Sequence, residues 1–132
     1  MANRPVHFEI QADDLERAKA FYADCFGWTF EDYSEFTGSP YWGAITGPDD
    51  EPGINGALLP RPAATPAPGQ GTNAFVCTFG TDDYDATEAK ILAAGGQVAL
   101  PKMALTGMAW QGYYLDTEGN TFGIHQPDPE AR

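Results

Sequence analysis

Two histidines and one glutamate are the residues whose types and spacing could support chemistry in this chain. His7 and Glu9 are two positions apart in the segment VHFEI, and His125 lies near the C-terminal end. Because side chains alternate along a strand, His7 and Glu9 are expected on one face of the same strand. Two imidazoles and one carboxylate suit Zn, Ni, Mn or Fe. The three residues predict either a divalent-metal site, with Glu9 as third ligand or general base, or the polar wall of a ligand pocket.

A strand and the helix after it would hold His7 and Glu9 in position. The helix is expected to begin at Asp13, with Glu16 completing a capping box, and to stop at Gly27. The apolar residues of the strand, which alternate with His7 and Glu9, are expected beneath the helix: Val6, Phe8 and Ile10. The matching buried stripe of the helix follows a helical spacing: Leu15, Ala18, Tyr22 and Cys25.

The same strand and helix pattern returns in the second half of the chain. At a constant offset Asp13 matches Asp82 and Gly27 matches Gly96. The second helix is expected to be capped at Asp82 and to end at Gly95 and Gly96, with a buried stripe of Tyr84, Thr87, Ile91 and Ala94. Its preceding strand is expected to place three residues beneath the helix: Phe75, Cys77 and Phe79. An internal repeat of a strand and helix unit therefore organises the fold.

Further strands complete each half. They are expected at 28–33, 41–46 and 54–59 in the first half, with loops at 34–40 and 47–53. In the second half a strand at 73–79 and a helix at 83–94 precede strands at 97–100, 108–115 and 121–126, with a loop at 101–107. Gly56 and Pro60 match Gly123 and Pro127 at a second constant offset.

The chain is therefore expected to be one domain, 1–132, made of two modules. A βαβββ module at 6–59 and another at 73–126 are joined by a proline-rich linker at 60–72. One module alone would leave open sheet edges, so the two are expected to complete each other. The predicted fold class is α+β, with two βαβββ repeats forming a cup-shaped, half-open mixed β-sheet and the helices on its outside.

Composition excludes several classes of function. Nineteen acidic residues against seven basic ones give a formal charge of −12, which argues against a nucleic-acid partner. No apolar run is long enough to span a membrane, and the N-terminus lacks a signal-peptide pattern, so a cytoplasmic protein is expected. Cys25 and Cys77 are isolated on core-facing positions and are expected to be buried free thiols. Nucleotide-binding, serine-nucleophile and zincin motifs do not occur.

Three segments carry a resemblance to a known family: VHFEI with DDLERAKAFYADCFGW, TDDYDATEAKILAAGG, and the ending LDTEGNTFGIHQPD. Together they resemble the vicinal oxygen chelate superfamily, the glyoxalase, bleomycin-resistance and extradiol dioxygenase group. The ending looks like the family's D-P-x-G-x-x-F pattern, with Thr117 in place of proline. This ending and the sequence FGW after the first helix together look most like those of uncharacterised lactoylglutathione-lyase-related proteins.

This resemblance implies four metal-ligand positions, of which one carries a donor here. His7 fits the first position, but its repeat mate is Val76, which cannot bind a metal. The two end positions fall on Gly56 and Gly123, which have no side chain, and Asn55 is the polar residue nearest to Gly56. A catalytic divalent site needs about three protein ligands. The donor count therefore favours a protein without a catalytic metal, unless His7, Glu9 and His125 form a different site.

Three hypotheses of function follow from these residues and this resemblance. The first is a small-molecule-binding protein whose cup holds an aromatic or cationic ligand against His7, Glu9, Trp42, Trp110, Tyr114 and His125. The second is a metal-dependent lyase, isomerase or dioxygenase acting on a substrate with adjacent oxygens. The third is a dimeric interaction module with an empty cup. A homodimer is expected under each, with the modules paired within a chain or exchanged between chains.

Overall fold

The structure is a computed structural model that describes residues 5–65, 67 and 75–132. The contacts divide the chain into two units, Met1–Thr65 and Pro66–Arg132. The division falls within the stretch 60–72 that the sequence predicts as a linker. The start of the strand predicted at 73–79 lies outside the described residues.

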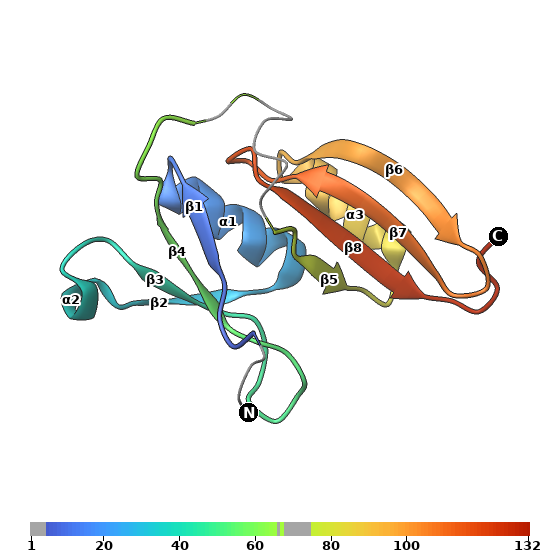
Figure 1. The fold of residues 1–132 in the computed structure, drawn as a ribbon, viewed down its shortest axis with the longest axis horizontal. Helices are drawn as coiled ribbons and strands as arrows, with labels where there is room; N and C mark the ends of the chain where they lie inside the picture. Colours follow the sequence, from blue (N-terminus) through green and yellow to red (C-terminus); the bar gives the residue numbers. More distant parts are fainter. Residues whose placement is uncertain (1–4, 66, 68–74) are drawn as a thin grey trace. The chain divides into compact units, whose positions relative to one another are not determined.

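The first unit is a four-stranded mixed sheet with one long helix (Figure 1). Its elements are β1 (Glu9–Ala12), α1 (Leu15–Phe26), β2 (Thr29–Asp32), α2 (Ser34–Thr37), β3 (Trp42–Ile45) and β4 (Gly56–Pro60). The strand order is β1-β4-β3-β2. β1 runs parallel to β4, and the other two pairings are antiparallel.

The second unit repeats this topology (Figure 1). Its elements are β5 (Thr78–Gly80), α3 (Tyr84–Ala93), β6 (Gln97–Leu105), β7 (Ala109–Leu115) and β8 (Thr121–Pro127). The strand order is β5-β8-β7-β6, with β5 parallel to β8 and the other pairs antiparallel. The predicted α+β class with two βαβββ repeats is thereby confirmed.

Aspartates cap both long helices, one residue later than the sequence predicts. The side chain of Asp14 accepts a hydrogen bond from the Arg17 N–H at 3.0 Å, and Asp83 accepts one from Ala86 at 3.0 Å. Asp13 instead forms an ion pair with Arg61, whose Nε lies 3.3 Å from Oδ1. The predicted stop at Gly27 is confirmed, since this residue takes the left-handed conformation with φ 72°.

Each sheet packs one face against its long helix. In the first unit Ala12, Ala18 and Leu58 are fully buried, and four partly buried residues surround them: Ile10, Leu15, Phe30 and Trp42. Beside this cluster Tyr22 stacks on Trp28 with ring centroids 4.8 Å apart. In the second unit the large residues buried between α3 and the sheet are Tyr84, Ile91, Tyr114, Phe122 and Ile124.

Two residues predicted beneath the second helix lie at the surface. Phe75 and Cys77 are exposed, and both precede β5, which begins at Thr78. Phe79 does pack inward, with its ring 5.5 Å from that of Phe122. Cys25 is buried, and both cysteines are free. The prediction of two buried thiols is therefore wrong for Cys77.

Two predicted loops contain regular structure. The stretch 101–107 was expected to be a loop, but β6 continues through it to Leu105. The pairing shifts there: Leu100 faces Tyr113 and Met103 faces Gln111, so Pro101 and Lys102 together face Gly112. Such a bulge accommodates a proline, which has no N–H to donate. The stretch 34–40 contains the short helix α2.

The register corrects one part of the predicted repeat. The Ala57 N–H donates to the Phe8 carbonyl at 3.0 Å, and the Gly123 N–H donates to the Cys77 carbonyl at 2.9 Å. Because Phe8 and Cys77 correspond in the two halves, Ala57 rather than Gly56 corresponds to Gly123. The sequence match of Gly56 with Gly123 is thus shifted by one residue, which moves Gly56 to the opposite sheet face.

No helix among the described residues is long and apolar enough to cross a membrane.

Candidate functional site

Each sheet has a second face, opposite its long helix, which we call the helix-free face. In the first unit Ile10 and Leu58 point toward α1, so Glu9 and Ala57, their neighbours in the strands, point the other way. His7 precedes Glu9 by two residues and shares this side. The predicted pair therefore lies together on the helix-free face.

A tyrosine that the sequence reading did not select joins His7 to Glu9. The Tyr41 hydroxyl donates to Glu9 Oε2 at 2.7 Å, and His7 Nε2 lies 3.0 Å from the same hydroxyl oxygen. His7 Nε2 is 3.8 Å from Glu9 Oε2. About half of the His7 and Glu9 side-chain surfaces is exposed, at 47% and 45%. We call these three residues the His7 cluster.

The hydrogen bond to Glu9 keeps Tyr41 protonated. This bond, together with burial and the charge of Glu9, raises the pKa of Tyr41 from 10 to about 12. Losing the phenol proton would place two negative oxygens in contact, which is unfavourable at this distance. Tyr41 is therefore a neutral hydrogen-bond donor at physiological pH.

Alkaline titration gives a direct check on this pairing. Because folding raises the Tyr41 pKa above its unfolded value of 10, its contribution to stability is full below pH 10 and is lost as the pH rises toward about 12. We expect Tyr41→Phe to reduce the late-titrating tyrosinate absorbance by one tyrosine, while Tyr33 and Tyr84, whose pKa values are also raised, still titrate late. The variant Glu9→Gln should move the titration of Tyr41 to lower pH. An unchanged late step in Tyr41→Phe would contradict the assignment.

A straight row of four residues crosses the helix-free face of the first unit. Glu9 pairs with Ala57, Ala57 with Gly43, and Gly43 with Glu31. With strands about 4.8 Å apart, the two glutamates lie about 14 Å from each other. Tyr33 donates a hydrogen bond to Glu31 and holds its ring where a side chain at Gly43 would lie. The row therefore has a carboxylate hydrogen-bonded to a tyrosine at each end. Its centre consists of two small residues, Ala57 and Gly43, and the ring of Tyr33.

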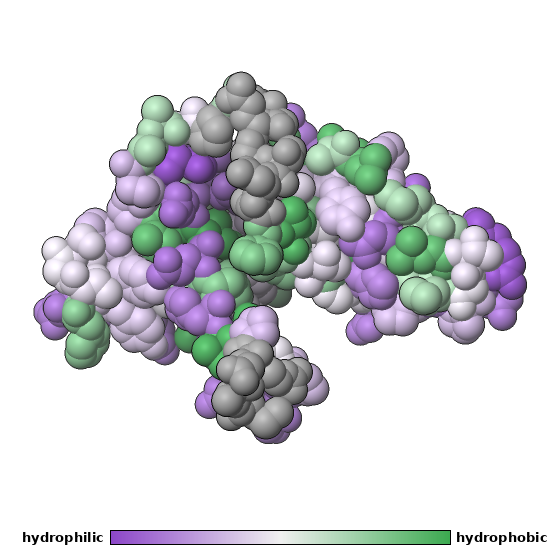
Figure 2. Space-filling view, viewed as in Figure 1, coloured by the Kyte–Doolittle hydropathy of each residue, from purple (hydrophilic) through white to green (hydrophobic). Residues whose placement is uncertain are grey.

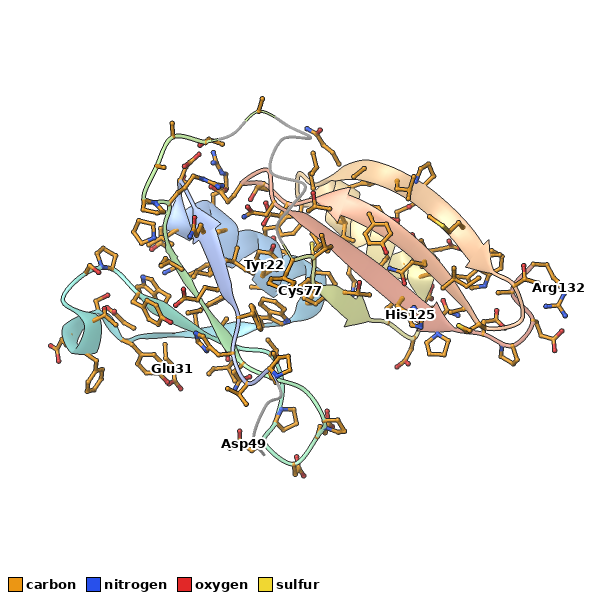
Figure 3. All side chains as sticks on the ribbon, in the orientation of Figure 1. Tyr22, Glu31, Asp49, Cys77, His125 and Arg132 are labelled. Carbon is orange, nitrogen blue, oxygen red and sulfur yellow. The ribbon has the colours of Figure 1, made fainter. Side chains whose placement is uncertain are left out.

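The helix-free face of the second unit carries the other histidine. His125 Nδ1 lies 2.7 Å from the side-chain oxygen of Gln111, which is buried. Gly123 shares the face, and a Cβ there would come within 2.8 Å of the Thr78 hydroxyl and 2.9 Å of Gln111 Nε2. Figure 3 shows His125 on β8 and Glu31 on β2. We call Gln111 and His125 the His125 pair.

The three predicted aromatic ligand contacts lie on the other faces. Trp42 packs in the α1 core, with the Lys19 ammonium 3.4 Å from its ring centroid. Tyr114 is fully buried and donates a hydrogen bond to Glu88. Trp110 alternates with Gln111, so it faces the α3 side, and its Nε1–H donates to Asp128 at 3.0 Å. The sequence alone left open which sheet face each of these three residues would take. Alternation along the observed strands places all three toward the helices.

The donor set does not fit the metal site that the resemblance implies. Of the corresponding positions, His7 has a nitrogen donor, whereas Val76, Gly123 and the corrected position Ala57 have none. Gly56, the position that the sequence match gave, does not fit either. A Cβ there would lie 2.5 Å from the Phe8 carbonyl oxygen, which leaves no room for a metal-binding side chain. Among residues 5–65, 67 and 75–132, no three His, Cys, Asp or Glu side chains are grouped to hold an ion.

Sequence reasoning missed Tyr41 and Gln111, the partners of the two histidines. They are equivalent in the repeat, because β3 pairs Gly43 with Ala57 as β7 pairs Tyr113 with Gly123. Tyr41 and Gln111 each stand two residues earlier in the chain. Both fall inside the third strand that the sequence predicts for each half, at 41–46 and 108–115, so a search of those strands for polar residues would have included them.

Two known proteins are similar to the chain in sequence over most of its length. It is 28% identical over 127 residues to CFP32 of Mycobacterium tuberculosis, which is named for an unproven glyoxylase activity, and 26% identical over 129 residues to the anthracycline biosynthesis protein DnrV of Streptomyces peucetius. These alignments cover 92% and 91% of this chain but 45% and 46% of those proteins, so the chain spans about half the length of these relatives.

Among solved structures, TnmS3, an antibiotic-binding protein from Streptomyces sp. CB03234, is 26% identical with a TM-score of 0.69. That alignment covers 97% of this chain and 99% of TnmS3. The fosfomycin resistance protein FosX from Listeria monocytogenes shares the fold, with a TM-score of 0.72 at 17% identity over 96% of this chain and 94% of FosX. The family model that matches residues 4–124 spans most of the chain. The protein therefore belongs to the Glyoxalase/Bleomycin resistance protein/Dioxygenase superfamily.

Proposed function

We propose that this protein binds a small, flat, cationic organic molecule on a helix-free face, and that it does so without a catalytic metal. The observation that carries the proposal is the row from Glu9 through Ala57 and Gly43 to Glu31. Carboxylates attract an amine, and the Tyr33 ring between them offers a stacking surface for an aromatic ring. The net charge of −12 also favours approach of a cation.

Two relatives support this choice of ligand class. TnmS3 is named as an antibiotic-binding protein and DnrV as an anthracycline biosynthesis protein. An anthracycline combines a flat polycyclic chromophore with an amino sugar, which are the two features that the row suits. The missing donors at Val76, Ala57 and Gly123 support binding over metal-dependent chemistry.

Thermal shift with an anthracycline and its uncharged aglycone tests the proposal. We expect the anthracycline to raise the melting temperature and to bind more tightly than the aglycone, because only the former carries the amine. Glu9→Gln and Glu31→Gln should each weaken binding about fivefold, or about 1 kcal/mol, as expected for an exposed ion pair.

The matched control is Asp24→Asn, an equal charge change on the exposed side of α1. It should leave the affinity unchanged if the row, rather than net charge, binds the ligand. Failure of both compounds to shift the melting temperature would refute the proposed ligand class. Elemental analysis of protein from metal-supplemented medium, beside His7→Ala, tests the metal-dependent enzyme as the alternative. One equivalent of metal that the variant loses would favour it.

A further inference from the structure

We propose that Tyr41 and Gln111 fix the tautomers of the two histidines, so that each helix-free face offers a ligand an imidazole nitrogen that accepts hydrogen bonds. The ligand is then one that carries hydrogen-bond donors, such as phenolic hydroxyls. This inference rests on the proposed function, because it names the polar groups that the bound molecule must present. The two units support it by separate arrangements of atoms.

In the first unit the argument is a count of protons. Tyr41 has one hydroxyl proton, and its 2.7 Å contact with the Glu9 carboxylate uses it, because a carboxylate can only accept. The contact of 3.0 Å between His7 Nε2 and the same hydroxyl must then be donated by the histidine. In a neutral imidazole only one nitrogen carries a proton. His7 therefore keeps the lone pair on Nδ1.

In the second unit an amide sets the opposite tautomer. The oxygen of Gln111 lies 2.7 Å from His125 Nδ1, and an amide oxygen can only accept. Nδ1 therefore carries the proton, and the lone pair of neutral His125 is on Nε2. Gln111 is buried, with 7% of its surface exposed, so packing holds the amide in place. His125 itself is half-buried and keeps part of its ring at the surface.

This assignment gives the ligand a defined chemistry. Acceptors at His7 Nδ1 and His125 Nε2 would pair with hydroxyl or N–H donors. A ligand whose hydroxyls are methylated would leave the nitrogen that it covers on either face without a donor, which costs affinity when the groups are desolvated. Tyr41 and Gln111 act through the histidines and are positioning residues.

Long-range proton–nitrogen NMR of isotope-labelled protein tests the tautomers. The chain has two histidines, so His7→Gln assigns both sets of signals. At the alkaline plateau, where imidazole is neutral, we expect His125 as the Nδ1–H form and His7 as the Nε2–H form. Gln111→Leu should shift His125 toward the Nε2–H form, whereas Gln111→Glu keeps an acceptor and should preserve Nδ1–H. An Nε2–H pattern for His125 in the unaltered protein would overturn the inference.

A binding comparison separates this inference from the proposed function. The probes are a dihydroxyanthraquinone with an aminoalkyl side chain and its dimethyl ether, which share a ring system and an amine and differ in their hydroxyl donors. We expect the dihydroxy compound to bind at least tenfold more tightly and Gln111→Leu to reduce the preference. Asp24→Asn, on the exposed side of α1 and away from both helix-free faces, should retain it. Equal binding of the two probes would overturn the inference while the proposed function stands. Binding of neither probe would count against the proposed function.

Discussion

Replacing Gly112 with alanine is expected to destabilise the core of the second unit strongly. A Cβ at this position would overlap the Tyr84 hydroxyl, which hydrogen-bonds to Tyr114 at 2.7 Å. Both tyrosines are buried between α3 and the sheet, so neither ring can move without opening the core. Such overpacking typically costs about 1–3 kcal/mol, and an overlap this close should lie at the upper end of that range. Denaturant unfolding followed by circular dichroism would measure the loss.

Two variants make this expectation specific. Tyr84→Phe removes the overlapping oxygen, so Gly112→Ala should cost clearly less in that background than alone. Gly80→Ala is the matched control, because no atom lies within 4 Å of a Cβ built there. A Gly80→Ala protein as unstable as Gly112→Ala would show that the overlap is not the cause.

Replacing Tyr22 with alanine is expected to have a comparable effect in the first unit. Tyr22 is 1% exposed and stacks on Trp28, and its ring also meets Phe21 edge-on with centroids 5.1 Å apart. Removing such a ring leaves a cavity and typically costs about 3–5 kcal/mol. We expect a lower denaturation midpoint and a change in tryptophan fluorescence as Trp28 loses its partner.

The control for Tyr22 is another aromatic residue of the same unit. Phe36 in α2 is 85% exposed, so Phe36→Ala should change stability by less than about 0.5 kcal/mol. If both variants were equally destabilised, aromatic content rather than burial would explain the result.

Local sequence signals predicted most of the fold, because most helices and strands carry their own start signal, stop signal or apolar stripe. Gly27 stops α1, the aspartates start both helices, and the apolar stripes place Tyr22 and Ile91 in the cores. The misses occur where tertiary pairing overrides local signals. Pro101 suggested a loop, but a bulge against β7 lets β6 continue past it.

The site was only half predictable for a related reason. Alternation correctly places His7 and Glu9 on one face, since a strand's period is fixed. Tyr41 and Gln111 are joined to the histidines across strands, and that pairing depends on register. A one-residue error in register, as at Gly56, exchanges the two faces, and single-sequence matching cannot detect it.

The bulge at Pro101 and Lys102 has a consequence for how the protein behaves in a crowded solution. β6 is nine residues long and lies at the edge of its sheet. It exposes Val98, Leu100 and Leu105, and Figure 2 shows apolar residues on this part of the second unit. A flat apolar edge of this length would invite another chain to add a strand. At the bulge, Pro101 has no N–H to donate, so β6 cannot offer another strand a regular ladder of hydrogen bonds. The bulge also places the charged Lys102 next to this proline. The bulge therefore reduces the tendency of this edge to aggregate by adding a strand from another chain.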